Sequence, residues 1–362
     1  MSAHQTPEAG LGTIERLQAT GGNGIGRSVL VFNPYASSAG RLAVEMNRLQ
    51  SDPAFQKPTI VYTNVDPSLT IRQVHGALDS DTTQMVVAIG GDETARQVVE
   101  ALCTARDEHD KPARNKIFSV LHRGNAGNLA ANLAGGNPHT NPLDVVQRGI
   151  LTEIQPGVVA YPSPQGETIE KYFTTIMGLG ALSIGAKALN TWMRRLPKFD
   201  NPRMRDIYER TILTPYTYLA GSKFSLVVAT SLAEPGGQTV AEATSVEICS
   251  YDIARARHIG KHGNLPVDIT DHQLFAFIMG SRKPREVWEW SQRIQSRTLP
   301  GQFFDANKVL RLIPDRPIWA NVDGTHFPVG ANSRLEARLA ETSFLTFMVK
   351  PPEQVHDIYL AN

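Results

Sequence analysis

Val86-Val87-Ala88-Ile89-Gly90-Gly91-Asp92-Glu93-Thr94 is the stretch that decides the fold of this chain. An apolar, β-branched segment stops at two glycines, and a helical pattern follows over residues 95–102. This pattern predicts a buried strand, a tight turn and a helix. Glycines let backbone N–H groups approach a ligand closely, and the N-terminus of a helix favours anions. The stretch therefore predicts a nucleotide site, although a glycine-rich turn with a capping Asp or Thr is also an ordinary structural device.

The size and composition of the chain are those of a globular protein. Its 362 residues are 41% hydrophobic, which is sufficient for two domains. The 36 Lys and Arg residues nearly balance the 35 Asp and Glu residues, so the net charge of +1 predicts no nucleic-acid partner. Cys103 and Cys249 are far apart in sequence and predict reduced thiols. Because no apolar stretch approaches the roughly 18 residues that span a bilayer and residues 1–10 hold no signal core, we expect a cytoplasmic protein.

Strand-like and helical segments alternate in the first part of the chain. The apolar runs end in polar turns at Asn33, Gly90 and Gly124. This alternation predicts a parallel sheet with helices on its faces, and such sheets bind ligands at the carboxyl ends of their strands. We expect residues 28–145 to form an α/β nucleotide-binding domain after a flexible lead-in, 1–27. The predicted strands cover residues 28–32, 59–63, 85–89 and 117–121.

The pattern changes after about residue 142. Short strand-like segments separated by Pro, Gly and charged turns predict an antiparallel β-sandwich over residues 146–350, which would form the substrate domain. A helical pattern interrupts it at about 184–220, and the sequence leaves open whether residues 351–362 return to the first domain. The predicted strands of this part cover residues 151–154, 158–161, 172–177, 224–229, 245–251, 273–279, 308–313 and 343–349.

The helical insertion combines an aromatic residue with basic ones, namely Trp192 with Arg194, Arg195 and Lys198. This is the composition of an interfacial helix that makes a peripheral contact with a membrane. Core packing of Trp192 beneath solvated arginines accounts for the same residues. The sequence leaves both interpretations open, and it does not determine the oligomeric state.

Four short motifs occur in order along the chain: Asn33-Pro34 followed by the longer turn 35–40, the Gly90–Thr94 turn, the turn over 122–130, and Asp323-Gly324-Thr325. In this order they resemble the catalytic family of diacylglycerol kinases, sphingosine kinases and bacterial lipid kinases. That family carries Asn-Pro-x-Ser-Gly, Gly-Gly-Asp-Gly-Thr, Pro-x-Gly-Thr-x-Asn-Asp-Phe-Ala and Asp-Gly-Glu in these places. Its nucleotide domain is related to that of NAD kinases. The order of the four motifs is more specific than any one motif.

The resemblance implies a phosphotransferase that uses ATP and Mg²⁺. In that family the ATP phosphates lie against the glycine turns, Mg²⁺ bridges their oxygens, and an acceptor alcohol attacks the γ-phosphorus. By this analogy Asp92 organises the metal and the nucleotide or assists deprotonation. The other catalytic candidates are Glu93, Asp323 and Thr325. The nucleotide-binding candidates are Asn33, Pro34, Ser37, Thr63, Gly90, Gly91, Thr94, Gly124, Asn125 and Asn128.

The chain departs from the family pattern at three positions where the family carries its catalytic or nucleotide-binding residues. Glu93 replaces a glycine, which is strained if the position needs a positive φ, and it puts a carboxylate beside a polyphosphate. Thr325 replaces the glutamate taken to be the general base, and an uncharged hydroxyl is a poor proton acceptor. The turn at Gly124 lacks the family's Thr and its amide-acid pair. Two interpretations compete: a divergent lipid kinase in which Glu93 or Asp323 has become the base or metal ligand, and a catalytically silent relative that binds a nucleotide or a protein partner. A kinase for a soluble alcohol is the third.

Overall fold

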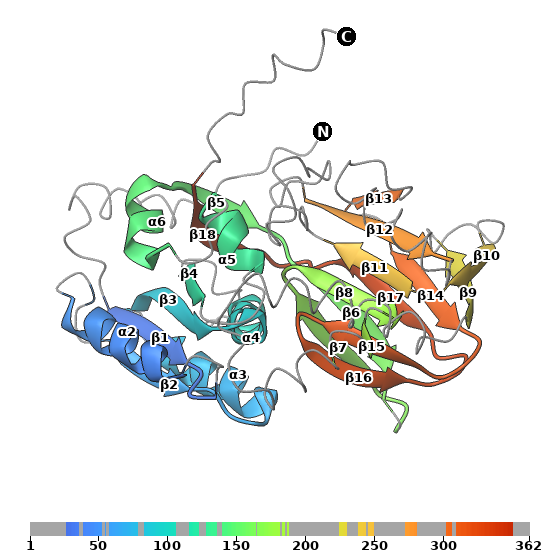
Figure 1. Ribbon diagram of the computed structural model, residues 1–362, viewed down its shortest axis with the longest axis horizontal. Helices are drawn as coiled ribbons and strands as arrows, with labels where there is room; N and C mark the ends of the chain where they lie inside the picture. Colours follow the sequence, from blue (N-terminus) through green and yellow to red (C-terminus); the bar gives the residue numbers. More distant parts are fainter. Residues whose placement is uncertain are drawn as a thin grey trace, which may run out of the picture. The chain divides into compact units, whose positions relative to one another are not determined.

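The described residues form two compact units. The computed structural model (Figure 1) describes residues 27–35, 39–52, 55, 58–78, 83–105, 116–122, 128–135, 140–163, 165–181, 183–184, 187, 224–229, 238–243, 245–249, 272–280, 302–305 and 309–349. Unit 1 contains the described residues of 27–155 and 342–349, and unit 2 contains those of 156–249 and 272–341.

Unit 1 is built on a six-stranded sheet. Its strands are β1 (Arg27–Phe32), β2 (Thr59–Tyr62), β3 (Thr83–Gly90), β4 (Ile117–His122), β5 (Ile150–Ile154) and β18 (Phe344–Met348). They lie in the order β2-β1-β3-β4-β18-β5, and all neighbours are parallel except β5, which runs antiparallel to β18. β1 and β3 are buried over almost their whole length, as expected for parallel strands covered on both faces.

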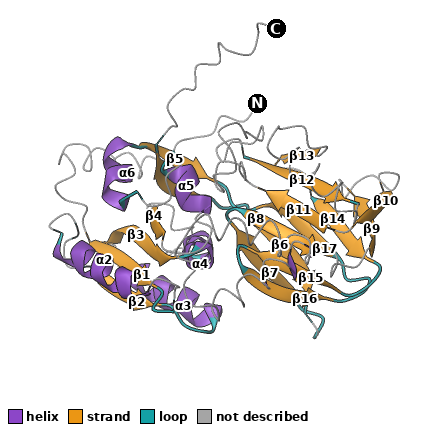
Figure 2. Cartoon of the chain, in the orientation of Figure 1, coloured by secondary structure: helices purple, strands orange, loops and turns teal. Residues whose placement is uncertain are grey.

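Five helices of the described chain accompany this sheet (Figure 2). They are α2 (Ala39–Ser51), α3 (Pro67–Leu78), α4 (Asp92–Thr104), α5 (Asn128–Leu133) and α6 (Pro142–Arg148). Met46 and Leu49 of α2 and Val145 of α6 share one core with Leu30 and Val87 of the sheet. The residues of β1 and β3 that point the opposite way are also fully buried, and α3 and α4 contact these two strands. The α/β part of the predicted fold is confirmed.

Two strands lie in a different sheet from the one predicted. Residues 151–154 and 343–349 were expected in the β-sandwich, but β5 and β18 pair with each other in unit 1, and β18 also pairs with β4 (Figure 1). The Thr346 hydroxyl donates to the Phe118 carbonyl oxygen at 2.9 Å, and the rings of Phe118 and Phe344 meet edge to face at 5.4 Å. A short apolar run predicts a strand but does not identify its partner, because the partner is set by contacts remote in sequence.

Unit 2 consists of two antiparallel six-stranded sheets. The first has the order β10-β9-β14-β17-β6-β7 and the second the order β13-β12-β11-β8-β15-β16. The strands of the first sheet are β6 (Gly157–Pro162), β7 (Thr168–Phe173), β9 (Phe224–Ala229), β10 (Gln238–Ala243), β14 (Leu310–Pro314) and β17 (Leu335–Leu339). Those of the second are β8 (Ile176–Gly180), β11 (Ser245–Cys249), β12 (Gln273–Met279), β13 (Gln302–Asp305), β15 (Ile318–Val322) and β16 (Thr325–Val329).

One apolar core joins the two sheets of unit 2. It includes Val159 and Phe173 of the first sheet and Met177 and Leu179 of the second. The rings of Tyr161 on β6 and Phe327 on β16 stack with their centroids 4.4 Å apart. The two sheets therefore pack face to face, and the predicted β-sandwich is confirmed.

Several predictions fall on residues that the structure does not describe. Residues 188–220 of the helical insertion, with Trp192 and its basic neighbours, lie outside the described ranges, as do the lead-in 1–26 and residues 351–362. Within the described ranges, no helix is both long enough and apolar enough to cross a bilayer.

Candidate functional site

The first part of the candidate site is the turn from β3 into α4. β3 ends at Gly90, Gly91 is the N-cap of α4 in an extended conformation (φ −93°, ψ −174°), and no side chain caps the helix. Asp92 and Glu93 form the first turn of the helix and are partly exposed. The N-terminus of a helix attracts anions through its backbone N–H groups and its dipole. The turn therefore has the local structure that suits a phosphate group.

The turn after β1 is tied directly to this one. The Asn33 amide group donates from Nδ2 to the Thr94 hydroxyl oxygen at 3.2 Å, and the Asn33 backbone N–H donates to the Ile89 carbonyl oxygen at 3.0 Å. The Tyr35 N–H donates to Asn33 Oδ1 at 2.9 Å. Because the Thr94 side chain is buried, its hydroxyl group fixes the position of the Asn33 side chain. Two turns that are 61 residues apart thus form one polar edge of the sheet.

Gly90 makes this approach of the two turns possible. A Cβ atom at residue 90 would lie 2.4 Å from Thr94 Oγ1 and 3.1 Å from the Asn33 Cβ. The first contact is too close for a real Cβ atom and the second is tight, so the absence of a side chain, and not a positive φ, is what the position requires.

Thr63 and Pro34 lie at the same edge of the sheet. The Thr63 N–H donates to the Phe32 carbonyl oxygen at 2.9 Å, which places the residue after β2 beside the end of β1. Two exposed aromatic side chains were not predicted: Tyr35 in the turn after β1 and Tyr62, the last residue of β2. Their position at or just after the ends of strands was the signal that could have identified them, because residues there reach the ligand edge of a parallel sheet.

Glu93 is not strained. It lies in the first turn of α4, and among the described non-glycine residues only His272, Asp323 and Asn332 have a positive φ. The backbone of Glu93 is therefore unstrained. Its side chain does add a second carboxylate next to Asp92, as the sequence indicated. Oxygen ligands from one or two carboxylates, completed by phosphate oxygens, are the usual protein environment of Mg²⁺. The residues at this turn fit a magnesium ion held jointly with a polyphosphate, and within the described chain no three His, Cys, Asp or Glu side chains gather into a separate metal site.

Part of the predicted nucleotide site cannot be placed. Ser37, Gly124 and Asn125 lie outside the described residues. Asn128 is the first residue of α5, which follows β4 at the same edge of the sheet as the β3 turn.

Asp323 lies in unit 2, in the tight turn between β15 and β16. Its carboxylate is buried and accepts five hydrogen bonds from three consecutive residues: from the backbone N–H and hydroxyl groups of Thr174 and Thr175 and from the Ile176 N–H. Burial raises the pKa of the Asp323 carboxyl, and these hydrogen bonds act in the opposite direction. Both carboxylate oxygens accept hydrogen bonds from the protein. Asp323 therefore joins the turn between β15 and β16 to the turn between β7 and β8.

Thr325 and His326 follow this turn on β16. Thr325 pairs with Val322 and is partly exposed. Burial and the Lys187 ammonium group lower the pKa of His326 to about 4. Hydrogen bonds with the backbone of Gly324 and of Ser183 act in the opposite direction. The imidazole is therefore neutral at pH 7. A lone histidine beside the last motif was the available sequence signal, and it was missed.

Arg96 was also missed by the sequence reasoning. Its side chain is 1% exposed within α4 and forms an ion pair with Glu100 one turn later. Its Nε and Nη2 atoms have no hydrogen-bond partner in the described chain, and the same holds for Oε1 of Gln97, the next residue in sequence. A charged residue between the apolar positions 95 and 98 was the signal for it.

No protein-family model matches the chain, and no curated protein matches it. Solved structures do match. A diacylglycerol kinase from Bacillus anthracis str. Sterne is 11% identical with a TM-score of 0.56, covering 88% of this chain and 96% of its own. A putative diacylglycerol kinase from the same bacterium is 12% identical with a TM-score of 0.56 (90% and 98%).

Yeast NADH kinase complexed with NADH is 11% identical with a TM-score of 0.50, covering 91% of this chain and 84% of its own. At such identities the similarity establishes the fold. The chain has the fold shared by diacylglycerol kinases and NAD kinase-like proteins, and the predicted resemblance is confirmed at that level.

Proposed function

We propose that this chain is an ATP-dependent kinase that transfers the γ-phosphoryl group of ATP to a hydroxyl group of a lipid-like acceptor. The observation that carries the proposal is the Asn33–Thr94 hydrogen bond across Gly90, which joins two strand-end turns beside the uncapped start of α4. A polar edge of this kind, next to partly exposed carboxylates, is suited to a polyphosphate and a divalent cation.

The reaction needs positioning more than covalent help from the protein. The acceptor oxygen attacks the γ-phosphorus while the bond to the β,γ-bridging oxygen breaks; the alcohol passes its proton to the carboxylate of Asp92 or Glu93, and ADP leaves. In this proposal the turn at Gly90 and Gly91 holds the phosphates, Asn33 contacts phosphate or ribose, and Asp92 with Glu93 holds Mg²⁺. When bound, Mg²⁺ neutralises the negative charge that develops on the phosphate oxygens.

Each of the two acceptor classes is supported by a different structural neighbour. A lipid alcohol is supported by similarity to structures named as diacylglycerol kinases, and a soluble alcohol by similarity to the yeast NADH kinase complexed with NADH. A protein that phosphorylates a lipid also needs a peripheral contact with the membrane surface. Two observations favour a catalytically silent nucleotide-binding protein. Thr325 occupies the place of the family's base, and both carboxylate oxygens of Asp323 accept hydrogen bonds from residues of unit 2.

The test combines a thermal-shift measurement with an assay of phosphoryl transfer from ATP across a panel of lipid and soluble alcohols. Asp92→Asn is expected to abolish the stabilisation by ATP and Mg²⁺ together and to abolish transfer. Asp144→Asn is the matched control, because Asp144 is an exposed acid in the first turn of α6 in the same unit. Stabilisation of Asp92→Asn by ATP and Mg²⁺ to the same extent as the wild type would contradict the proposed site.

Glu93→Gly separates the kinase from the silent protein. A divergent kinase that uses Glu93 as a magnesium ligand loses transfer in this variant. If the wild type binds ATP without transfer, and Glu93→Gly creates transfer, the chain is a nucleotide-binding protein with a degenerate active site.

A further inference from the structure

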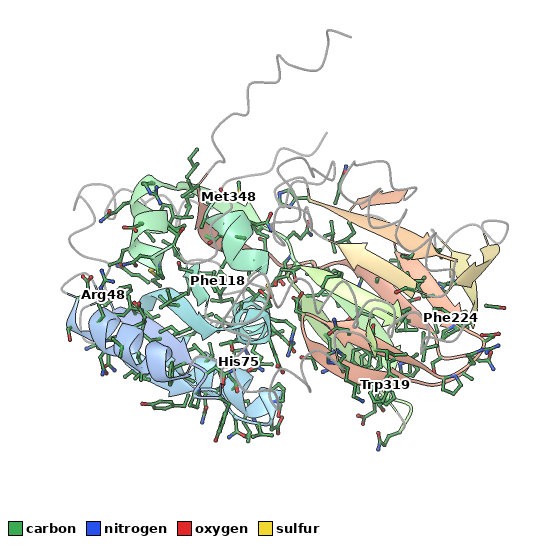
Figure 3. The ribbon with its side chains drawn as sticks, viewed as in Figure 1. Arg48, His75, Phe118, Phe224, Trp319 and Met348 are labelled. Carbon is green, nitrogen blue, oxygen red and sulfur yellow. The ribbon has the colours of Figure 1, made fainter. Side chains whose placement is uncertain are left out.

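Exposed apolar side chains gather at one edge of the sheet of unit 1. Six large hydrophobic side chains are exposed in the described part of the chain, and four of them lie at or after the ends of β1 and β2: Tyr35, Tyr62, Val65 and Leu69. Figure 3 draws the side chains of this part of unit 1, in which Arg48 of α2 and His75 of α3 are labelled. An exposed apolar side chain forgoes the stabilisation that burial gives, so a group of them at the ligand edge of a parallel sheet indicates a binding surface.

Two of the four residues are aromatic, and they come from adjoining strand ends. Phe32 and Tyr62 are paired residues of the parallel strands β1 and β2, and their rings meet edge to face with the centroids 5.9 Å apart. Phe32 is buried, so it supports the ring of Tyr62, which is itself 51% exposed. Tyr35 follows Phe32 by three residues and is 75% exposed, and its N–H donates to Asn33 Oδ1 at 2.9 Å. This edge therefore presents two aromatic side chains to solvent.

The two tyrosines lie beside the turn that is suited to a phosphate group. Asn33, the residue after Phe32, donates to the Thr94 hydroxyl oxygen in the first turn of α4. β1 is the one strand between β2 and β3, so the ends of β2 and β3 are about 10 Å apart at the ordinary strand spacing. The ribose and α-phosphate of a nucleotide can span this separation. Phosphates at Gly90 and Gly91 would thus bring the base to the ends of β1 and β2.

We propose that Tyr62, together with Tyr35, forms the surface on which the base of the nucleotide stacks, and that this surface prefers a purine. The inference rests on the proposed kinase function, because the turn at Gly90 and Gly91 has to hold the phosphates of the same nucleotide. An aromatic ring stacks on any base, and a purine offers it a larger face than a pyrimidine does. The tyrosines therefore select the nucleotide, whereas the turn binds its phosphates.

Inorganic tripolyphosphate separates the two parts of this site, because it carries three phosphates and no base. Isothermal titration with ATP, CTP and tripolyphosphate, each with Mg²⁺, measures the three affinities. Tyr62→Ala is expected to weaken ATP binding by about tenfold and to leave tripolyphosphate binding unchanged, since it removes only the stacked ring. Tyr62→Phe keeps the ring and is expected to bind ATP as the wild type does. Tyr35→Ala is expected to act in the same direction as Tyr62→Ala.

The preference between bases is a second readout of the same titrations. The wild type is expected to bind ATP more tightly than CTP, and Tyr62→Ala is expected to reduce this difference. Ile150→Ala is the matched control, because Ile150 is an exposed apolar residue of β5, the strand at the opposite side of the same sheet. This control is expected to leave all three affinities unchanged.

The outcomes distinguish the stacking surface from the kinase site. If Tyr62→Ala binds ATP as tightly as Ile150→Ala does, the stacking surface is wrong and the phosphate turn stands. Equal weakening of ATP and tripolyphosphate binding in Tyr62→Ala also overturns it, because Tyr62 then supports the fold of the edge and not the base. If ATP binding depends on Tyr62 but no alcohol is phosphorylated, the stacking surface stands and the kinase activity fails. If the wild type binds none of the three probes, both proposals fail.

Discussion

Asp92 in unit 1 and Asp323 in unit 2 both adjoin glycine in a tight turn, yet their surroundings differ. Asp92 begins a helix, is partly exposed and stands beside a turn with no capping side chain. Asp323 is buried, and its oxygens accept five hydrogen bonds from residues 174–176. Whether an acidic residue of a motif can bind a ligand or instead stabilises the fold therefore depends on the hydrogen-bond donors around it. These donors are not part of the motif.

The strongest test of this difference removes each carboxylate in turn. Asp323→Ala is expected to lower the free energy of unfolding of unit 2 by about 3 kcal/mol or more, because five buried donors lose their acceptor. Asp92→Ala is expected to change the stability of unit 1 by at most about 1 kcal/mol, since Asp92 is partly exposed in the first turn of its helix. Urea unfolding followed by tryptophan fluorescence and circular dichroism measures both. Equal losses of unfolding free energy in the two variants would contradict the difference between Asp92 and Asp323.

The next test concerns how closely the ligand turns of unit 1 approach each other. Gly90→Ala places a Cβ atom against the Thr94 side chain and is expected to cost about 1–3 kcal/mol and to weaken nucleotide binding. Gly76→Ala, in α3, is the control: no atom lies within 4 Å of its added Cβ, so this variant is expected to gain about 1 kcal/mol. Melting temperatures with and without ATP and Mg²⁺ measure both effects. A gain in stability for both variants would show that Gly90 is not needed for close packing.

A smaller effect is expected from the hydrogen bond that joins these turns. Thr94→Val keeps the shape of the side chain and removes the acceptor of the Asn33 Nδ2–H, so a loss of about 1 kcal/mol is expected. Nucleotide affinity should fall as well, because Asn33 is no longer held in position. Isothermal titration with ATP and Mg²⁺ measures the affinity. An unchanged affinity would indicate that Asn33 does not contact the nucleotide.

A further test is the pH dependence of the stability of unit 2. His326 has a pKa of about 4 in the folded chain, below its ordinary value of 6.5. Its contribution to stability is therefore fully present above pH 6.5 and is lost as the pH falls through 4. His326→Asn is expected to remove this part of the pH dependence, measured as the difference in unfolding free energy between variant and wild type from pH 4 to pH 7. A difference that does not vary over this range would contradict the low pKa.

The sequence predicted local secondary structure better than it predicted which strands pair with each other. The Gly90-Gly91 turn and the helix after it were predicted closely, because glycines, apolar strands and helical periodicity are encoded within a few residues. β5 and β18 were assigned to the wrong sheet, since strand pairing depends on residues that are distant in sequence. Glu93 would have been strained only at a positive φ, and this condition is not met because the residue is helical.

The sequence by itself determined the alternation of strands and helices in unit 1, the strand-rich character of unit 2 and the order of the four motifs. Those features depend on local backbone preference and on the period of apolar residues. Only the tertiary structure decided that Asn33 reaches Thr94, that Asp323 is saturated by residues 174–176, and that the rings of Phe32 and Tyr62 meet at the ends of neighbouring strands. Hydrogen bonding and burial depend on which remote groups surround a side chain, and no spacing along the chain specifies them.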